Sequence, residues 1–170
     1  CFQEGMGQEA ISLAGHLRLG KLTFLWDDNE ITDDGQTALS ISEDIPSRFR
    51  AAHWHVIEVN GHDIQAIDAA LTEARSDPRP SLIACRTVIA KGIPRLEGQR
   101  GGHSAPLTDR DSSEMREALS WSYPAFTIPE SIYNDYAASM DKGRSAYRSW
   151  KTQTDAHPMK TEFDHWYQSP

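Results

Sequence analysis

The stretch LTFLWDDNEITDDG, residues 22–35, decides the fold of this chain. Its apolar beginning is typical of a buried strand, and the acids, the Asn and the Gly that follow are typical of the loop at that strand's C-terminal end. In open α/β sheets, ligands bind at this end of the strands. Asp27, Asp28 and Asn29 carry oxygens of the kind that Mg²⁺ or Ca²⁺ prefers. The same composition also fits a solvated turn in which the two Asp side chains shape the loop and cap backbone donors.

Strands and helices alternate along the first half of the sequence. We expect strands at 21–26, 54–59 and 82–89, and helices at 4–19, 43–52 and 64–75. Strands that alternate with helices are typical of a parallel sheet whose crossover connections are helical. The sequence therefore predicts an α/β fold with a parallel sheet.

A glycine-rich stretch, 95–102, follows the third strand and leads to His103. We expect a flexible loop here, and we expect it beside the Asn29 loop because both leave the C-terminal ends of strands. A loop histidine in that place can donate a proton or a hydrogen bond to an anion, and a solvent-exposed histidine without chemistry is the alternative. We interpret His62, in the turn after the second strand, as a loop residue without chemistry.

The last third of the sequence predicts helices joined by an aromatic-rich connector. A helix is expected at 111–120, a longer helix at 131–154, and a short helix in the tail around Phe163 and Trp166. We place a boundary between one domain, 1–130, and a helical segment with a linker, 131–170.

Composition restricts the class of protein. The formal net charge of −8 over 170 residues argues against a nucleic-acid-binding surface, and no apolar run reaches the length of a membrane span. The two cysteines, Cys1 and Cys85, lack the spacing of a zinc site. Cys85 lies in an apolar run and is expected to be a buried free thiol, which favours a cytoplasmic protein.

Three blocks of the sequence resemble the thiamine-diphosphate signature of transketolases. The blocks are CFQEG at 1–5, SLAGHL at 12–17 and DDNEITDDG at 27–35, and the family pattern is Gly-Asp-Gly-Cys-x-Gln-Glu-Gly, Ser-Leu-Ala-Gly-His-Leu and Asp-Asp-Asn-x-Ile-Thr-x-Asp-Gly. HSAPL at 103–107 resembles the family's His-Gly-Ala-Pro-Leu. The chain begins just after the position of Gly-Asp-Gly, so we expect it to be an internal piece of a larger enzyme.

The resemblance implies a set of site residues within a diphosphate-binding domain. Mg²⁺ (or Ca²⁺) would be held by the Asp of Gly-Asp-Gly, the side-chain oxygen of Asn29 and the backbone carbonyl of Ile31, together with diphosphate oxygens and a water. Ile89 would pack against the cofactor, and His103 would lie over the diphosphate and reach the substrate. Glu4 would lie near the interface between two subunits of a homodimer.

The resemblance also implies an activity for the parent protein. It would move a two-carbon ketol unit from a ketose phosphate to an aldose phosphate in the pentose phosphate pathway, with sugar phosphates as its partners, and the pyrimidine-binding domain would lie in later sequence. A dihydroxyacetone synthase, a deoxyxylulose phosphate synthase, or a non-catalytic α/β interaction module for the isolated chain are alternatives. Ser104 replaces the family's usual Gly, and Ala90-Lys91 replaces Gly and an aromatic, so substrate preference is in question.

Overall fold

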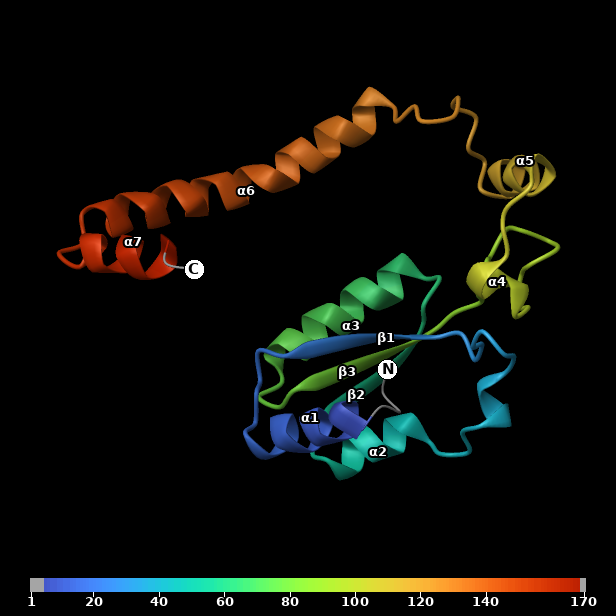
Figure 1. Cartoon of the computed structure of the whole chain (residues 1–170), viewed down its shortest axis with the longest axis horizontal. Coiled ribbons are helices and arrows are strands. Elements are labelled where there is room, and N and C mark those ends of the chain that lie inside the picture. The colour runs from blue at the N-terminus through green and yellow to red at the C-terminus, as the bar shows by residue number, and fades with distance from the viewer. Residues whose placement is uncertain (1–4, 169–170) are drawn as a thin grey trace. The chain divides into compact units, whose positions relative to one another are not determined.

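A computed structural model of the chain describes residues 5–168 (Figure 1). The chain divides into two compact units, Cys1–Trp121 and Ser122–Pro170, and each is described by itself. Glu4 lies outside the described residues, so its expected place near a subunit interface stays a prediction. The assignment of 1–130 and 131–170 to separate parts of a larger enzyme also stays a prediction.

The first unit is built on a parallel sheet of three strands. They are β1 (Thr23–Asp28), β2 (His55–Asn60) and β3 (Ser81–Arg86), in the order β1-β3-β2. The register pairs Asp28 and Asn60 with Arg86, so all three strands end at the same level. The central strand β3 is buried along its first five residues, which agrees with its continuous apolar sequence. The predicted parallel sheet is confirmed.

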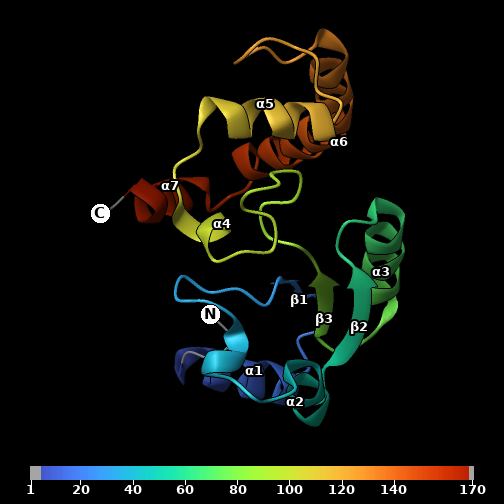
Figure 2. The same ribbon diagram turned by 90° about the vertical axis from the view of Figure 1, so that its right-hand side faces the viewer.

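Helices cover both faces of this sheet (Figures 1 and 2). Helices α1 (Gly5–His16) and α2 (Ile45–Ala51) lie on one face, and α3 (Ile64–Ser76) lies on the other. Successive residues of a strand point to opposite faces, so Leu82 packs in the core under α1 and α2 while Ile83 packs under α3. Each face therefore has its own buried cluster.

The core under α1 and α2 is centred on Trp54, which is 1% exposed. Its indole N–H donates to the carbonyl of Ile11, 2.9 Å away, and its ring meets that of Phe49 edge-on with centroids 4.9 Å apart. The hydrogen bond satisfies the one polar atom of a large buried ring. Gly15 lets α1 approach the end of α2, because a Cβ at this position would lie 1.8 Å from the carbonyl oxygen of Ala52.

The chain beyond β3 forms a short helix, α4 (Gly101–Ser104), and a longer one, α5 (Asp109–Ala118). Thr108 and Asp111 form a capping box at the start of α5. Arg95 donates two hydrogen bonds, of 3.0 and 2.7 Å, to the buried carboxylate of Asp111. Arg95, together with Thr108, holds the pKa of Asp111 well below its usual range. This network fixes the segment after β3 to the start of α5.

The second unit is helical, as predicted. It contains α6 (Glu130–Asp155) and α7 (Lys160–Gln168), and no side chain of either helix is buried. In the first unit, a short 3₁₀ turn, η1 (Thr37–Leu39), follows β1 and completes the elements of the described chain. Within residues 5–168, no helix combines the length and the apolar character that a membrane crossing requires.

Candidate functional site

A cleft of about 320 Å³ opens where the three strands end. All three post-strand segments contribute to its lining, which consists of Asn29, Glu30, Ile31, Gln36, Asn60, His62, Arg86, Thr87, Val88 and Gly98. This is the edge at which open α/β sheets bind ligands. The structure therefore brings two of the predicted site residues, Asn29 and Ile31, into one cleft.

The loop after β1 is held by its own side chains. Asn29 accepts a hydrogen bond at its Oδ1 from the N–H of Ile31, 2.9 Å away, and Ile31 forms an isolated antiparallel bridge with Gln36. Glu30 adopts a φ of 58°, a left-handed conformation that is uncommon for residues other than glycine. An amide oxygen has two lone pairs, so one remains at Asn29 for a further partner.

Asp27 and Asp28 are not in the loop, contrary to the prediction. They are the last two residues of β1 and pair with Cys85 and Arg86 of β3. Their carboxylates receive hydrogen bonds from side chains of the neighbouring segment: Asp27 from the hydroxyl of Thr87, and Asp28 from Arg86 at 3.1 Å. Both acids thus join strand ends to one another.

Arg86 is the positive charge of the cleft, and acids balance it. Its guanidinium pairs with Asp28 and also with Glu30. The hydrogen bond from Arg86 lowers the pKa of the Glu30 carboxyl, and the contact with Glu30 raises the pKa of Arg86. Asp28 and Glu30 are therefore the ion-pair partners of Arg86.

His62 has a structural role that the sequence interpretation missed. Its Nε2 accepts a hydrogen bond of 2.9 Å from the N–H of Val88, and its own N–H donates to Oδ1 of Asn60 at 3.0 Å. His62 therefore joins the turn after β2 to the segment after β3. The position of His62 in the turn after a strand could have indicated this role, since residues in such turns converge at one edge of a parallel sheet.

His103 lies in α4, not in the flexible loop that we predicted. It does not line the cleft: its Nδ1 is 3.5 Å from Oδ1 of Asp33, and about half of its side chain is exposed. Ile89 lies against α4, because a Cβ at Gly102 would be 3.2 Å from its Cγ1. Ile89 therefore lies beside the helix that carries His103, but neither residue lines the cleft that contains Asn29 and Ile31. The contact between His103 and Asp33 connects this helix to the loop after β1.

Asn29 and Ile31 can offer only neutral oxygens to a metal ion. Within residues 5–168, no cluster of three His, Cys, Asp or Glu side chains could hold a metal ion. Asn29 offers an amide oxygen and Ile31 a backbone carbonyl, and both are ligands that hard divalent cations accept. Two neutral oxygens leave most of the ligand positions of a divalent cation to other groups.

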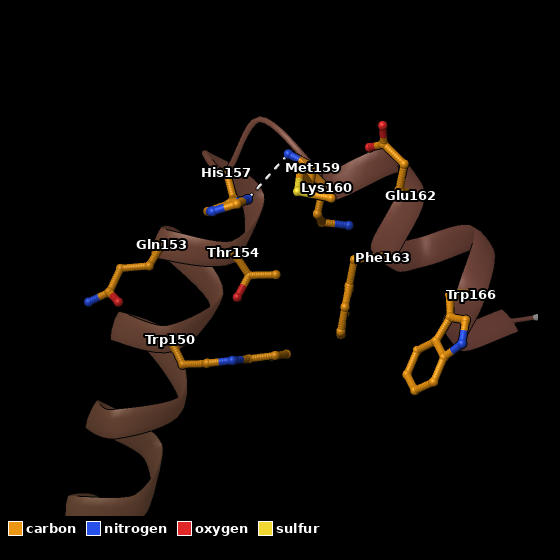
Figure 3. A pocket seen from close by; sticks show the side chains of 9 residues that line it. All are labelled: Trp150, Gln153, Thr154, His157, Met159, Lys160, Glu162, Phe163 and Trp166. Carbon is orange, nitrogen blue, oxygen red and sulfur yellow. Dashed lines mark hydrogen bonds between the residues drawn. The ribbon is translucent and has the colours of Figure 1, made fainter.

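A larger pocket, of about 600 Å³, lies within the second unit between α6 and α7 (Figure 3). Trp150 of α6 and Phe163 and Trp166 of α7 turn their rings toward it. In the turn between the helices, His157 accepts a hydrogen bond of 3.2 Å from the N–H of Met159. This pocket contains none of the predicted site residues, so we favour the strand-end cleft as the functional site despite its smaller volume.

Comparison with known proteins shows the family of the chain. A family model described as "Transketolase, thiamine diphosphate binding domain" matches residues 1–165. The chain belongs to the transketolase family. The predicted resemblance is thereby confirmed, and with it the identification of the fold as part of a thiamine-diphosphate-binding domain.

Individual transketolases match this chain over part of their own length. A transketolase of Cereibacter sphaeroides is 43% identical over 164 residues, which are 96% of this chain and 25% of the relative. The crystal structure of a Campylobacter jejuni transketolase has a TM-score of 0.87 at 30% identity, over 99% of this chain and 27% of that one. A mutant transketolase of Pichia stipitis in complex with fructose 6-phosphate has a TM-score of 0.84 at 34% identity, over 92% and 24%. This transketolase chain spans about a quarter of the length of its relatives.

Proposed function

We propose that this chain holds the diphosphate of thiamine diphosphate through a divalent cation, in a protein that transfers a two-carbon ketol unit between sugar phosphates. The observation that carries the proposal is the cleft at the strand ends, where Asn29 and Ile31 lie together in a chain of the transketolase family. A ketose phosphate, fructose 6-phosphate, is bound in one of the similar structures. This supports sugar phosphates as the substrate class.

The residues of the chain have separate tasks in this proposal. The Oδ1 of Asn29 and the carbonyl oxygen of Ile31 would bind Mg²⁺, or Ca²⁺ in its place, and leave the charge of the cation to the diphosphate. Ile89 would provide an apolar contact for the cofactor, and His103 would contact the substrate. Bound thiamine diphosphate supplies carbonyl attack and carbanion stabilisation, and the protein supplies binding and orientation.

The rest of the machinery would lie outside this chain. Two neutral oxygens are too few for the six ligands of a Mg²⁺ ion, and the family motif places a carboxylate ligand in Gly-Asp-Gly, before Cys1. We expect a second subunit of a homodimer to complete the active site, with Glu4 near the interface. The free, buried thiol of Cys85, whose pKa is raised by burial, suits a cytoplasmic protein. The pentose phosphate pathway is the place that the resemblance to transketolases implies.

Calorimetric titration with thiamine diphosphate and Mg²⁺ tests the proposal. The chain as given is compared with a chain extended by Gly-Asp-Gly before Cys1. We expect heat of binding only from the extended chain, and only when Mg²⁺ is present, because the carboxylate completes the ligand set. Equal binding without Mg²⁺, or equal binding by both chains, would contradict the metal assignment.

Activity provides a second test. We expect no detectable ketol transfer from the purified 170-residue chain, because the cation site is incomplete and the substrate site is not enclosed. A full-length transketolase polypeptide that carries this chain should convert a ketose phosphate and an aldose phosphate. Turnover by the chain alone would show that the site needs nothing beyond these residues.

A further inference from the structure

Two successive side chains of α4 meet one carboxylate of the loop after β1. Ser104 donates a hydrogen bond from Oγ to Oδ1 of Asp33, 3.0 Å away. His103 faces the same oxygen with its Nδ1, at 3.5 Å. These residues are about seventy positions apart in the sequence and belong to segments that leave different strands. The contact therefore joins the Asn29 loop to the segment that carries His103.

Asp33 is held in place by the hairpin around it. The N–H of Thr32 donates to the carbonyl of Gly35 at 2.7 Å, and the hydroxyl of Thr32 donates to the same oxygen at 3.0 Å. Gly35 has a φ of 145°, which a side chain rarely adopts. A turn with both backbone and side-chain hydrogen bonds fixes the backbone around Asp33, from which its carboxylate reaches Ser104.

The position of His103 is also fixed on its own side. Its N–H donates to the carbonyl of Arg100 at 3.0 Å, and Gly102 allows α4 to lie close to Ile89. The ring of His103 is therefore free to rotate about its side-chain bonds only, and the carboxylate of Asp33 is the partner that faces Nδ1.

We propose that Asp33 is a positioning residue that sets the ring orientation and tautomer of His103, and that Ser104 holds the carboxylate of Asp33 for this task. A carboxylate beside Nδ1 favours the neutral tautomer with the proton on Nδ1, and the lone pair of Nε2 is then left for another partner. A separation of 3.5 Å is long for a hydrogen bond, and such contacts commonly shorten when a ligand binds.

The consequence for catalysis rests on the proposed function, in which His103 contacts the substrate. A histidine whose Nε2 is an acceptor receives a proton or a hydroxyl hydrogen bond from that substrate. Ser104 replaces the Gly of the family's His-Gly-Ala-Pro-Leu motif. Asp33 occupies the second variable position of the motif Asp-Asp-Asn-x-Ile-Thr-x-Asp-Gly. The arrangement is thus a feature of this chain that acts on the orientation of His103.

Nitrogen-15 NMR of the histidine-labelled chain tests the proposal without cofactor. At about pH 8, where imidazoles are mostly neutral, long-range correlations between ring protons and nitrogens report the tautomer. His103→Gln assigns the signals. We expect the Nδ1–H form to dominate at His103, and Asp33→Leu to lower the ratio of Nδ1–H to Nε2–H about threefold or more, as expected for the loss of one net hydrogen bond.

Further variants separate positioning from a change of structure. Asp33→Asn keeps an acceptor oxygen and should retain most of the Nδ1–H form, while Ser104→Gly should give a smaller decrease than Asp33→Leu. Asp34→Leu is the matched control, because it makes the same substitution one position along the turn. An unchanged tautomer ratio in Asp33→Leu, or an equal change in Asp34→Leu, would overturn the proposal.

Binding of thiamine diphosphate to the extended chain distinguishes this proposal from the proposed function. If the tautomer responds to Asp33→Leu but the extended chain binds no cofactor, the positioning role stands and the proposed function fails. If the cofactor binds but the tautomer does not respond, the positioning role alone is wrong.

Discussion

The side-chain oxygen of Asn29 accepts a hydrogen bond from the N–H of Ile31, two residues along the chain, at 2.9 Å. Asn60 makes the same contact with the N–H of His62, at 3.0 Å. Both asparagines line the cleft at the strand ends. They differ in the proposed function, because only Asn29 belongs to the expected cation-binding pair.

The two asparagines therefore make a matched pair of variants. Each substitution by Ala removes the hydrogen bond from a backbone N–H, and Asn29→Ala also removes a long, exposed one of 3.4 Å from Nδ2 to Asp27. We expect both to lower the free energy of unfolding by a similar amount, about 1 kcal/mol. Only Asn29→Ala should abolish Mg²⁺-dependent binding of thiamine diphosphate to the extended chain, measured by calorimetry. Loss of binding in Asn60→Ala, or retained binding in Asn29→Ala, would contradict the assignment of the cation site.

Local pattern was sufficient to predict the strands and most helices. The apolar runs before Asp27 and Cys85 indicate buried strands, and the structure has both as neighbours in a parallel sheet. Only β3 is buried, because β1 lies at the edge of the sheet and its side chains are partly or largely exposed. Pattern failed at Asp27 and Asp28, where pairing with β3 extends the strand through two acids. Cross-strand pairing overrides the low strand propensity of Asp in this context.

The contacts around the cleft were beyond prediction from sequence. The hydrogen bond between His62 and Val88 spans 26 positions, and the one between Ser104 and Asp33 spans 71. Neither leaves a periodic signal, because each depends on how whole strands are ordered in the sheet. What the sequence did indicate is the shared edge, since residues that follow parallel strands converge there.

Gly15 is a sensitive position in the packing of α1 against the end of α2. Gly15→Ala would place a Cβ 1.8 Å from the backbone oxygen of Ala52, so one helix must move. We expect a loss of about 3 kcal/mol in the free energy of unfolding, the upper range for an overpacked site. Urea unfolding followed by circular dichroism measures this loss.

Gly5→Ala, at the start of the same helix, is the control for that substitution. A Cβ at Gly5 would have no atom within 4 Å, so its effect should stay below about 0.5 kcal/mol. An equally small effect at Gly15 would show that the approach of α1 to Ala52 is looser than the structure describes.

Ala90 occupies a backbone conformation that favours glycine. Its φ is 52°, in the left-handed region that costs an L-residue about 1–2 kcal/mol, and the family motif has Gly here. Ala90→Gly removes this cost but adds freedom to the unfolded chain, worth about 0.4–1 kcal/mol. We expect a net gain in stability of about 0.5–1 kcal/mol in urea unfolding.

Ala69→Gly should have the opposite effect, because Ala69 is an exposed residue in the interior of α3. Glycine in a helix interior costs about 0.5–1 kcal/mol relative to alanine. If both substitutions destabilised the chain equally, the left-handed conformation of Ala90 would be in error.

The carboxyl group of Asp77 makes the free energy of unfolding depend on pH. Two hydrogen bonds from the guanidinium of Arg79, of 3.0 and 2.9 Å, lower the pKa of the Asp77 carboxyl to about 2. The unfolded value is about 3.9. Because the folded pKa is the lower one, the stabilisation is present above about pH 4 and is lost as the pH falls toward 2.

Asp77→Asn should therefore lower the free energy of unfolding near neutral pH and reduce its decrease in acid, when urea unfolding at about pH 7 and about pH 3 is compared. Some acid sensitivity should remain, because Arg95 also lowers the pKa of Asp111. Asp68→Asn, on the exposed side of α3, is the control and should leave the pH dependence close to that of the unaltered chain. If Asp77→Asn and Asp68→Asn gave the same pH dependence, the ion pair with Arg79 would contribute nothing that acid removes.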